Sequence, residues 1–255
     1  MKRLIHVIKK YDINFFVIGK GTNLLVSDSG FRGVILKLEG DFYKTKKITG
    51  NILKCGASVS LSNICFHALE NSLSGLEFAF GIPGSCGGAV YMNAGAYNSS
   101  ISNVIIQTVN LNLENNKIEI LGLKNLDFSY RSSIYFRKKY IILYSLFELK
   151  TDNRENIESR MTKYILKRKK SQPLDFPNAG SIFKKPRNNF AGALIEQSGL
   201  KNLKIGDAIV SDKHAGFIVN LGNAKAKDVN KLINIITKIV FEKTGIKLEK
   251  EILFL

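Results

Sequence analysis

Two glycine-rich runs in this sequence could bring main-chain amides close to a phosphate-bearing ligand. The first run is GKGTN, residues 19–23. The second is GIPGSCGGAVYMNAGAY, residues 81–97, with five Gly and three Ala in seventeen positions. Glycine has no Cβ and adopts positive φ readily, so such turns can expose N–H groups to phosphate oxygens. Ordinary tight turns are the alternative explanation for each run.

The first run does not fit the dinucleotide-binding pattern of Rossmann folds. That pattern needs G-x-G-x-x-G between a strand and a helix. Here Gly19 and Gly21 lead into TNLLVSD, which is typical of a strand rather than a helix. The run therefore gives no support to a Rossmann fold.

The composition is that of a folded, basic protein. The chain has 255 residues, 45 % of them hydrophobic and 23 % charged, and its formal net charge is +17 at pH 7. A strong positive charge suits anionic partners such as nucleic acid, a membrane surface or phosphate-bearing ligands. Thirty of the 38 basic residues are lysine, whereas proteins that read nucleic acid favour arginine. Since no zinc-finger spacing or RNA-recognition signature occurs, we expect no nucleic-acid partner.

The cysteine and histidine patterns indicate neither a metal site nor a disulfide framework. The three cysteines and three histidines are widely spaced: Cys55, Cys65, Cys86, His6, His67 and His214. Reduced thiols in the cytoplasm fit this pattern best. The basic N-terminal segment is interrupted by charged residues and lacks a signal-peptide core. We therefore expect a cytoplasmic protein with no bound metal and no membrane insertion.

Hydrophobic periodicity predicts helices and strands that do not alternate strictly, so the expected fold class is α+β. Helices are predicted over 4–11, 61–69, 154–170, 190–198 and 226–244. Strands are predicted over 14–19, 24–28, 33–38, 103–113, 117–121, 140–149, 216–221 and 246–255.

Three of these elements carry specific expectations about which residues face the core or end a helix. The first helix is expected to place on one side Leu4, Val7, Ile8 and Tyr11. The last strand is expected to place on one side Ile246, Leu248, Ile252 and Phe254. Gly245 stands where a left-handed glycine commonly ends a helix.

Five segments, taken in order, resemble the UDP-N-acetylenolpyruvoylglucosamine reductase (MurB) family. They are VIGKGTNLLVSD, LEFAFGIPGSCGGAVYMNAGAY, FSYRSSIY, NAGSIFKKP and HAGFIVN. The resemblance extends over nearly the whole chain, from Ile5 to Phe254. The tyrosine-bearing insertion of some members is missing, so the chain resembles the shorter type. Five ordered motifs are far more specific than any one of them.

The resemblance implies an FAD-binding fold of the vanillyl-alcohol-oxidase type in two lobes, with a C-terminal α+β substrate domain. The first lobe would comprise 1–38 with 246–255, the second 39–170, and the substrate domain 171–245. Family members carry further residues before the helix that opens this chain, so the first lobe is expected to be short here. The implied reaction is the NADPH-dependent reduction of UDP-N-acetylglucosamine enolpyruvate to UDP-N-acetylmuramate, a peptidoglycan precursor. We expect a monomer.

By this resemblance, FAD would be held by the two glycine-rich runs. The expected cofactor-binding residues are Gly19, Gly21, Thr22, Asn23, Gly81, Pro83, Gly84, Ser85, Gly87, Gly88, Asn93, Ala94 and Gly95. Binding is expected to be noncovalent, because no His or Cys stands in a flavin-linking context. NADPH would reduce the flavin and leave, and the substrate would then take its place.

The implied reaction needs a group that stabilises negative charge and a group that supplies a proton. Hydride addition to the vinyl CH₂ leaves charge on the neighbouring carbon and its carboxylate. By the resemblance, Arg131 would pair with that carboxylate through its permanently charged fork, and Ser181 would donate the proton. Glu251 would hydrogen-bond the developing charge. Its neighbours Leu253 and Leu255 are expected to desolvate it and raise its pKa.

The substrate's diphosphate is expected to lie near Tyr130, Lys184 and Lys185, and His214 is expected to make a local hydrogen bond. An ordinary structural or surface role is the alternative for each of these side chains. Three other functions stay open. They are a flavin oxidoreductase with another substrate, a non-catalytic remnant of the family that holds nucleotide, and a basic nucleic-acid binder whose affinity would fall steeply with salt.

Overall fold

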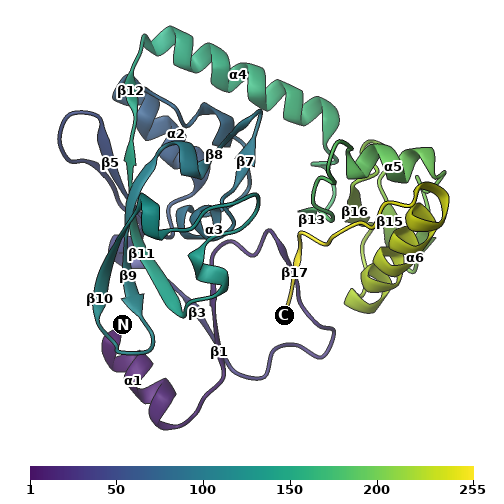
Figure 1. Ribbon diagram of the computed structural model, residues 1–255, viewed down its shortest axis with the longest axis horizontal. Coiled ribbons are helices and arrows are strands. Elements are labelled where there is room, and N and C mark those ends of the chain that lie inside the picture. The colour runs from purple at the N-terminus through teal and green to yellow at the C-terminus, as the bar shows by residue number, and fades with distance from the viewer. The chain divides into compact units, whose positions relative to one another are not determined.

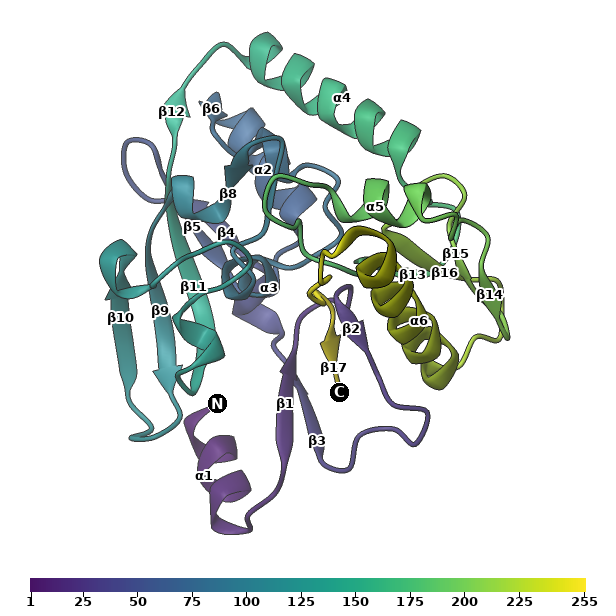
Figure 2. The same ribbon diagram turned by 45° about the vertical axis from the view of Figure 1, so that its right-hand side comes forward.

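Two separate apolar cores organise the chain in the computed structural model, which describes residues 1–255 (Figures 1 and 2). Unit 1 comprises Met1–Lys20 and Gly33–Leu166, and unit 2 comprises Gly21–Arg32 and Lys167–Leu255. The helices and strands confirm the predicted α+β class. The division into three lobes stays a prediction.

Unit 1 is built on a five-stranded sheet with the order β10-β9-β11-β5-β4, and all neighbouring strands are antiparallel. Its strands are β4 (Thr45–Lys47), β5 (Ile52–Gly56), β9 (Ile105–Asn112), β10 (Ile118–Gly122) and β11 (Tyr140–Glu148). Helix α2 (Leu61–Glu70) packs against α3 (Cys86–Tyr91), and α3 in turn contacts β5 and β11. The strands predicted over 103–113 and 117–121 are confirmed as β9 and β10, which pair as an antiparallel hairpin.

Smaller elements complete unit 1. The strand pairs are β1 (Phe15–Ile18) parallel to β3 (Val34–Lys37), β6 (Leu73–Ser74) antiparallel to β12 (Lys150–Thr151), and β7 (Gly95–Ala96) antiparallel to β8 (Ser99–Ser100). The helices are α1 (Lys2–Lys10) and the start of α4 (Arg154–Ser171). Single 3₁₀ turns lie at Gly40–Tyr43, Glu77–Ala79, Ile101–Asn103, Leu123–Asn125 and Ile134–Phe136.

Helix α1 buries a different face from the one predicted. Ile5 and Ile8 are buried in the core of unit 1, whereas Leu4, Val7 and Tyr11 are exposed. Apolar residues occupy positions 4, 5, 7 and 8. Two overlapping apolar faces therefore fit the helical period, and the period alone does not show which of them is buried. Strand β1 is half-buried along its whole length.

Unit 2 contains a four-stranded antiparallel sheet with the order β13-β16-β15-β14. Its strands are β13 (Asn178–Ser181), β14 (Lys204–Ile205), β15 (Ala208–Val210) and β16 (Phe217–Asn220). Helix α6 (Ala226–Thr244) packs against β14, β15 and α5 (Ala191–Gln197). The helix predicted over 226–244 is confirmed with the same bounds, and Gly245 follows it with φ +69°.

The segment Gly21–Arg32 joins unit 2 through the ends of two of its elements. Strand β2 (Leu24–Leu25) runs parallel to β17 (Leu253–Phe254). The Asp28 carboxylate accepts the amides of Ala226 and Lys227 at 2.7 and 3.1 Å, at the start of α6. These hydrogen bonds lower the pKa of Asp28, and the carboxylate also suits the positive end of the helix dipole.

The predicted C-terminal strand over 246–255 is wrong in length and in part of its pattern. Only Leu253–Phe254 pairs as a strand, and Phe254 is 46 % exposed, with the Lys250 ammonium 4.5 Å from the centre of its ring. Leu248 and Ile252 are buried as predicted. Before β17, the chain runs beside residues 182–184, where Lys250 and Phe183 form an isolated antiparallel bridge.

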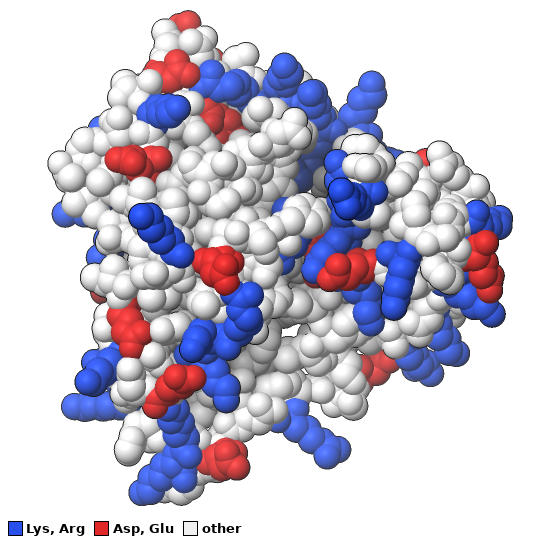
Figure 3. Space-filling view, in the orientation of Figure 1, with Lys and Arg blue, Asp and Glu red and all other residues white.

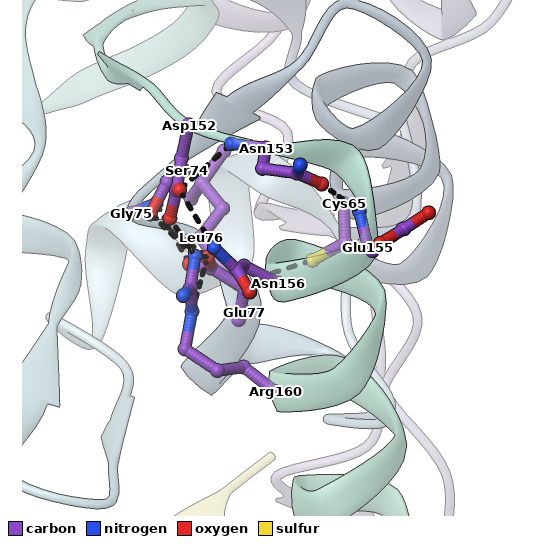
Figure 4. Close-up of polar contacts among 10 residues, drawn as sticks. All are labelled: Cys65, Ser74, Gly75, Leu76, Glu77, Asp152, Asn153, Glu155, Asn156 and Arg160. Atoms are coloured by element: carbon purple, nitrogen blue, oxygen red, sulfur yellow. Dashed lines mark hydrogen bonds and ion pairs between the residues drawn. The ribbon is translucent and has the colours of Figure 1, made fainter.

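A polar network around Arg160 ties the first turns of α4 to the rest of unit 1 (Figure 4). The Arg160 guanidinium donates twice to Glu77 Oε1, at 2.8 and 3.0 Å, and also to Asp152 Oδ2 and Ser74 Oγ. Glu77 Oε2 accepts the amide of Gly75 at 2.7 Å. Burial raises the pKa of Glu77, but the hydrogen bonds from main-chain amides, Arg160 and Ser74 outweigh it and leave the pKa lowered.

Replacing Arg160 with Met is expected to destabilise unit 1, because the carboxylate of Glu77 stays buried and loses its cation. Losing one partner of a fully buried pair costs about 3–5 kcal/mol, and we expect about 2–3 here because the Arg160 side chain is 36 % exposed. The measurement is the free energy of unfolding in urea. Arg154→Met, at the exposed start of the same helix, is the control, and an equal loss in both variants would contradict the prediction.

The lowered pKa of Glu77 also predicts a pH dependence. A carboxyl whose pKa is lower when folded than when unfolded stabilises the protein above its unfolded pKa, near 4.5, and loses that contribution as pH falls. Glu77→Gln should therefore lower the free energy of unfolding at pH 7 and lose less of it between pH 6 and pH 4. Urea unfolding of both proteins across that range tests this, and parallel curves would refute it.

Candidate functional site

The two glycine-rich runs of the sequence meet at Gly19 and Ser85 in unit 1. Ser85 is the N-cap of α3, and its hydroxyl accepts the amide of Gly88 at 3.3 Å. A Cβ on Gly19 would lie 2.4 Å from Ser85 Oγ, which is far inside contact distance. The missing side chain of Gly19 therefore allows the turn after β1 to lie directly on the start of α3.

Part of the small-residue run 81–97 serves packing within unit 1. No helix is predicted there, but residues 86–91 form α3. The amides of Cys86 and Gly87 donate to the carbonyls of Val59 and Ala57, both at 2.8 Å. A Cβ on Gly87 would lie 3.0 Å from that of Ala57. Gly87, one of the residues expected to bind the cofactor, thus already uses its amide inside the protein.

The outward side of the same run carries no bulky side chain. Pro83 and Gly88 are exposed, whereas Cys86 and Ala89 point into the core. A Cβ on Gly84 would meet nothing nearer than Leu61 at 3.7 Å. Main chain and small side chains thus form the surface from 83 to 88, and a flat ring or a phosphate group can approach them closely.

Arg131 lies in a tight turn of unit 1, closed by reciprocal hydrogen bonds between Ser129 and Ser132 at 3.1 and 3.2 Å. Its φ is +53°, in the left-handed region that non-glycine residues rarely adopt. The guanidinium donates to the carbonyl of Gly95 at 3.0 Å and lies 5.2 Å from the ring centre of Tyr130, which is exposed. A motif residue expected to be catalytic thus contacts the end of the small-residue run.

Ser181 and Glu251 come together in unit 2 through their backbones. The amide of Glu251 donates to the carbonyl of Ile182 at 2.8 Å, next to Ser181. Asn23 Nδ2 donates to the carbonyl of Glu251 at 3.2 Å, and the amide of Leu253 donates to the carbonyl of Asn23 at 3.0 Å. Three segments that are far apart in sequence therefore meet beside the end of β13, and two of them, those with Asn23 and Ser181, belong to the motifs of the sequence analysis.

The hydroxyl of Ser181 already has a partner within its own turn. Its Oγ donates to the carbonyl of Phe183 at 3.1 Å. The preceding Gly180 has φ +80°, and a Cβ there would lie 3.9 Å from the carbonyl of Thr22. A ligand that accepts the Ser181 proton must therefore compete with a neutral carbonyl.

His214 makes the local hydrogen bond expected of it. Its Nδ1 accepts the amide of Gly216 at 3.0 Å, and burial lowers the pKa of the imidazole. A Cβ on Gly216 would lie 2.9 Å from His214 Cε1 and 3.6 Å from Ser181 Oγ, so the ring and the serine flank the same glycine. A neutral ring with Nδ1 as acceptor carries its proton on Nε2.

The two lysines after Ser181 have neighbours of their own. Lys184 forms an ion pair with Glu249 at 2.5 Å, and the Lys185 ammonium lies 4.3 Å from the ring centre of Phe190. Their expected role near a diphosphate stays a prediction.

The structure contains no group of three or more side chains suited to hold a metal ion. The three cysteines are buried free thiols, and burial raises the pKa of each. None of the helices is long and apolar enough to span a membrane.

Known proteins match both parts of the chain. A family model of the FAD binding domain matches residues 1–115, and one of the UDP-N-acetylenolpyruvoylglucosamine reductase C-terminal domain matches residues 172–255. The UDP-N-acetylenolpyruvoylglucosamine reductases of Caldicellulosiruptor bescii and Caldanaerobacter subterraneus subsp. tengcongensis are 46 % and 47 % identical to this chain. These alignments cover 100 % and 98 % of the chain and 82 % of each relative.

The chain belongs to the UDP-N-acetylenolpyruvoylglucosamine reductase family. The structure of the family member from Thermus caldophilus superimposes with a TM-score of 0.85 at 33 % identity, covering 100 % of this chain and 89 % of that one. The family, the α+β class and the FAD-binding fold predicted from the sequence are thereby confirmed.

Adding one methyl group at Gly19 is expected to disturb the contact between the two glycine-rich runs. In Gly19→Ala the new Cβ meets Ser85 Oγ at 2.4 Å, and overpacking of this kind costs about 1–3 kcal/mol. The measurements are the free energy of unfolding and the FAD retained on purification.

The double variant Gly19→Ala/Ser85→Ala is the matched test of this clash. Without Oγ, the nearest Ser85 atom to the new Cβ is the serine Cβ at 3.5 Å, an ordinary contact. The double variant should therefore be less destabilised than the sum of the two single variants. Additive losses would show that another contact limits position 19.

Proposed function

We propose that this protein is an NADPH-dependent flavoenzyme that reduces UDP-N-acetylenolpyruvoylglucosamine to UDP-N-acetylmuramate in peptidoglycan precursor synthesis. The observation that carries the proposal is the hydrogen bond from the amide of Glu251 to the carbonyl of Ile182. It brings two of the three expected catalytic residues, Ser181 and Glu251, to neighbouring positions in a chain that belongs to this reductase family.

FAD suits the residues available to hold it. In unit 1, Gly19 lies against Ser85, and main chain with small side chains forms the surface from Pro83 to Gly88. In unit 2, Gly21 has φ +69° and is followed by Thr22 and Asn23. We propose that these residues bind it noncovalently, with Gly81 and the segment Asn93–Gly95 adjoining them. When bound, FAD carries the hydride from NADPH to the substrate.

Each proposed catalytic side chain has a distinct task. Arg131 binds the enolpyruvyl carboxylate and stabilises the negative charge that spreads into it as the carbon–hydrogen bond forms. Ser181 Oγ donates its proton to the neighbouring carbon. Glu251, in its protonated form, hydrogen-bonds the negative charge as it develops. Tyr130, Lys184 and Lys185 bind the nucleotide diphosphate, and Lys184 exchanges Glu249 for a phosphate oxygen.

The proposed setting is that of a monomer in the cytoplasm, with the chain divided into the three lobes given above. Three buried cysteines that form no disulfide suit a reducing compartment. Sedimentation of the purified protein tests the oligomeric state.

A nucleic-acid function is the alternative that the net charge of +17 suggests. On the face shown in Figure 3, however, Lys and Arg are spread over the surface with Asp and Glu among them, rather than gathered in one stripe. Binding along a phosphate backbone favours a continuous basic track. The distribution on this face therefore supports the flavoenzyme over the nucleic-acid binder.

One spectroscopic experiment separates the candidate functions. The purified protein should be yellow, lose its flavin absorbance with NADPH under nitrogen, and regain it when UDP-N-acetylenolpyruvoylglucosamine is added. Absorbance that bleaches but does not return with this substrate would indicate another flavin oxidoreductase. A protein that takes up no added FAD would indicate a remnant of the family without the reaction.

Ser181→Ala is expected to slow the return of flavin absorbance by about 10²–10⁴-fold, the usual effect of removing a positioned proton donor. Bleaching by NADPH should stay within twofold of wild type, because no proton from Ser181 is needed there. Ser198→Ala is the control, since Ser198 is a serine of unit 2 at the end of α5 and has no proposed role in the reaction. A Ser181→Ala enzyme that turns over at the control rate would remove Ser181 from the mechanism.

A further inference from the structure

Asn93 makes a pair of hydrogen bonds that contact with a cofactor does not explain. It is 6 % exposed and adopts φ +43° directly after α3. Its Nδ2 donates to the carbonyl of Ser129 at 2.9 Å, and its Oδ1 accepts the amide of Ser102 at 3.0 Å. Both ends of the side-chain amide are therefore used to join main-chain segments.

Two further side chains connect the same segments. Ser133 is fully buried, and its Oγ donates to the carbonyl of Tyr91 at 2.6 Å. The Arg131 guanidinium donates to the carbonyl of Gly95 at 3.0 Å. Positions 129, 131 and 133 are thus each bonded to the short segment 91–95, and together they define where the turn lies.

The turn needs this support because Arg131 has an unfavourable backbone conformation. A left-handed conformation costs a non-glycine residue roughly 1–2 kcal/mol, and Arg131 has φ +53°. Hydrogen bonds on both sides of Arg131 hold the turn against relaxation. Without the bond at Ser129, the first half of the turn could return to a common conformation and direct the guanidinium elsewhere.

We propose that Asn93 is a positioning residue for Arg131, because its bond to Ser129 fixes the turn from which the guanidinium reaches the substrate's carboxylate. The inference rests on the proposed function in one respect, namely that Arg131 contacts this substrate. It gives Asn93 a task beyond the contact with FAD that the resemblance implies.

Two substitutions at position 93 remove side-chain hydrogen bonds while they keep the backbone conformation, so that the effect of the bonds can be measured by itself. Asn93→Gly tolerates φ +43° and removes both hydrogen bonds. Asn93→Asp also tolerates that conformation and keeps an acceptor for Ser102, but it replaces the donor to Ser129 with an oxygen. Asn112→Ala is the matched control, since Asn112 is a buried asparagine of unit 1 whose side chain bonds Glu119 and the amides of residues 114 and 115.

The test follows flavin absorbance in the FAD-loaded protein under nitrogen. The flavin is reduced with dithionite, so that the result does not depend on NADPH, and is then mixed with UDP-N-acetylenolpyruvoylglucosamine. Asn93→Gly and Asn93→Asp should slow the return of absorbance by about 10–100-fold, the range expected when a catalytic group is misplaced by about 1 Å. The control Asn112→Ala should stay within twofold of wild type.

A double-variant cycle decides whether Asn93 acts through Arg131. If it does, Asn93→Gly/Arg131→Ala should be no slower than Arg131→Ala alone. Hydrogen–deuterium exchange gives a readout independent of activity, and residues 129–133 should exchange faster in both Asn93 variants and not in Asn112→Ala.

Four results would overturn the inference. Wild-type rates in both Asn93 variants, or multiplicative losses in the double variant, would show that Asn93 does not position Arg131, while the proposed function would stand. Unchanged exchange of residues 129–133 would do the same. If Arg131→Ala itself reoxidised at the wild-type rate, the proposed role of Arg131 and the inference drawn from it would both fail.

Discussion

Main chain lies directly against neighbouring groups at several points of the candidate site, and this is possible only where side chains are missing. Gly19 lies against Ser85, Gly95 against the carbonyl of Ser99, and Gly216 against His214. A Cβ at each of these glycines would come within 3.0 Å of another atom. These contacts place the first glycine-rich turn, the small-residue run and the turn beside Ser181. The same shortage of side chains leaves the surface from Pro83 to Gly88 open to a flat cofactor.

The sequence predicts the strongly patterned parts of the fold and misses the rest for identifiable reasons. Helix α6 is predicted with its bounds because its buried stripe is continuous and Gly245 ends it. Helix α3 is missed because glycine and alanine give no amphipathic pattern, although Ser85 before it is a typical N-cap. The sequence does not determine which face of α1 is buried, because its four apolar residues at positions 4, 5, 7 and 8 form two overlapping faces at helical spacing. The predicted C-terminal strand is longer than the observed one, because the length of a strand is set by the segments it pairs with. Here those segments, residues 182–184 among them, are distant in sequence.

The candidate site divides in the same way. Arg131 and Ser181 are predicted because they occur in segments that resemble one family, and Glu251 is predicted because the same resemblance implies a carboxylate near the C-terminus. The sequence does not predict that Asn93 and Ser133 join distant segments. Their hydrogen-bond partners are main-chain carbonyls 36 and 42 residues away, respectively. Every residue has such a carbonyl, so no sequence pattern marks the partner. The ion pair of Lys184 with Glu249 is hidden for a similar reason, because 65 residues separate the two charges.

Two of the proposed catalytic side chains are hydrogen-bonded within the protein, and this bears on how they could favour a transition state. Arg131 donates to the carbonyl of Gly95 and Ser181 to the carbonyl of Phe183, both neutral acceptors. Exchanging a neutral carbonyl for a carboxylate or a developing carbanion strengthens a hydrogen bond from the same donor, because charge-assisted bonds are roughly twice as strong. The gain grows as negative charge develops, so it is larger in the transition state than in the bound substrate. The internal hydrogen bonds therefore hold each donor in place. They also make the net stabilisation from each donor larger in the transition state than in the complex with the substrate.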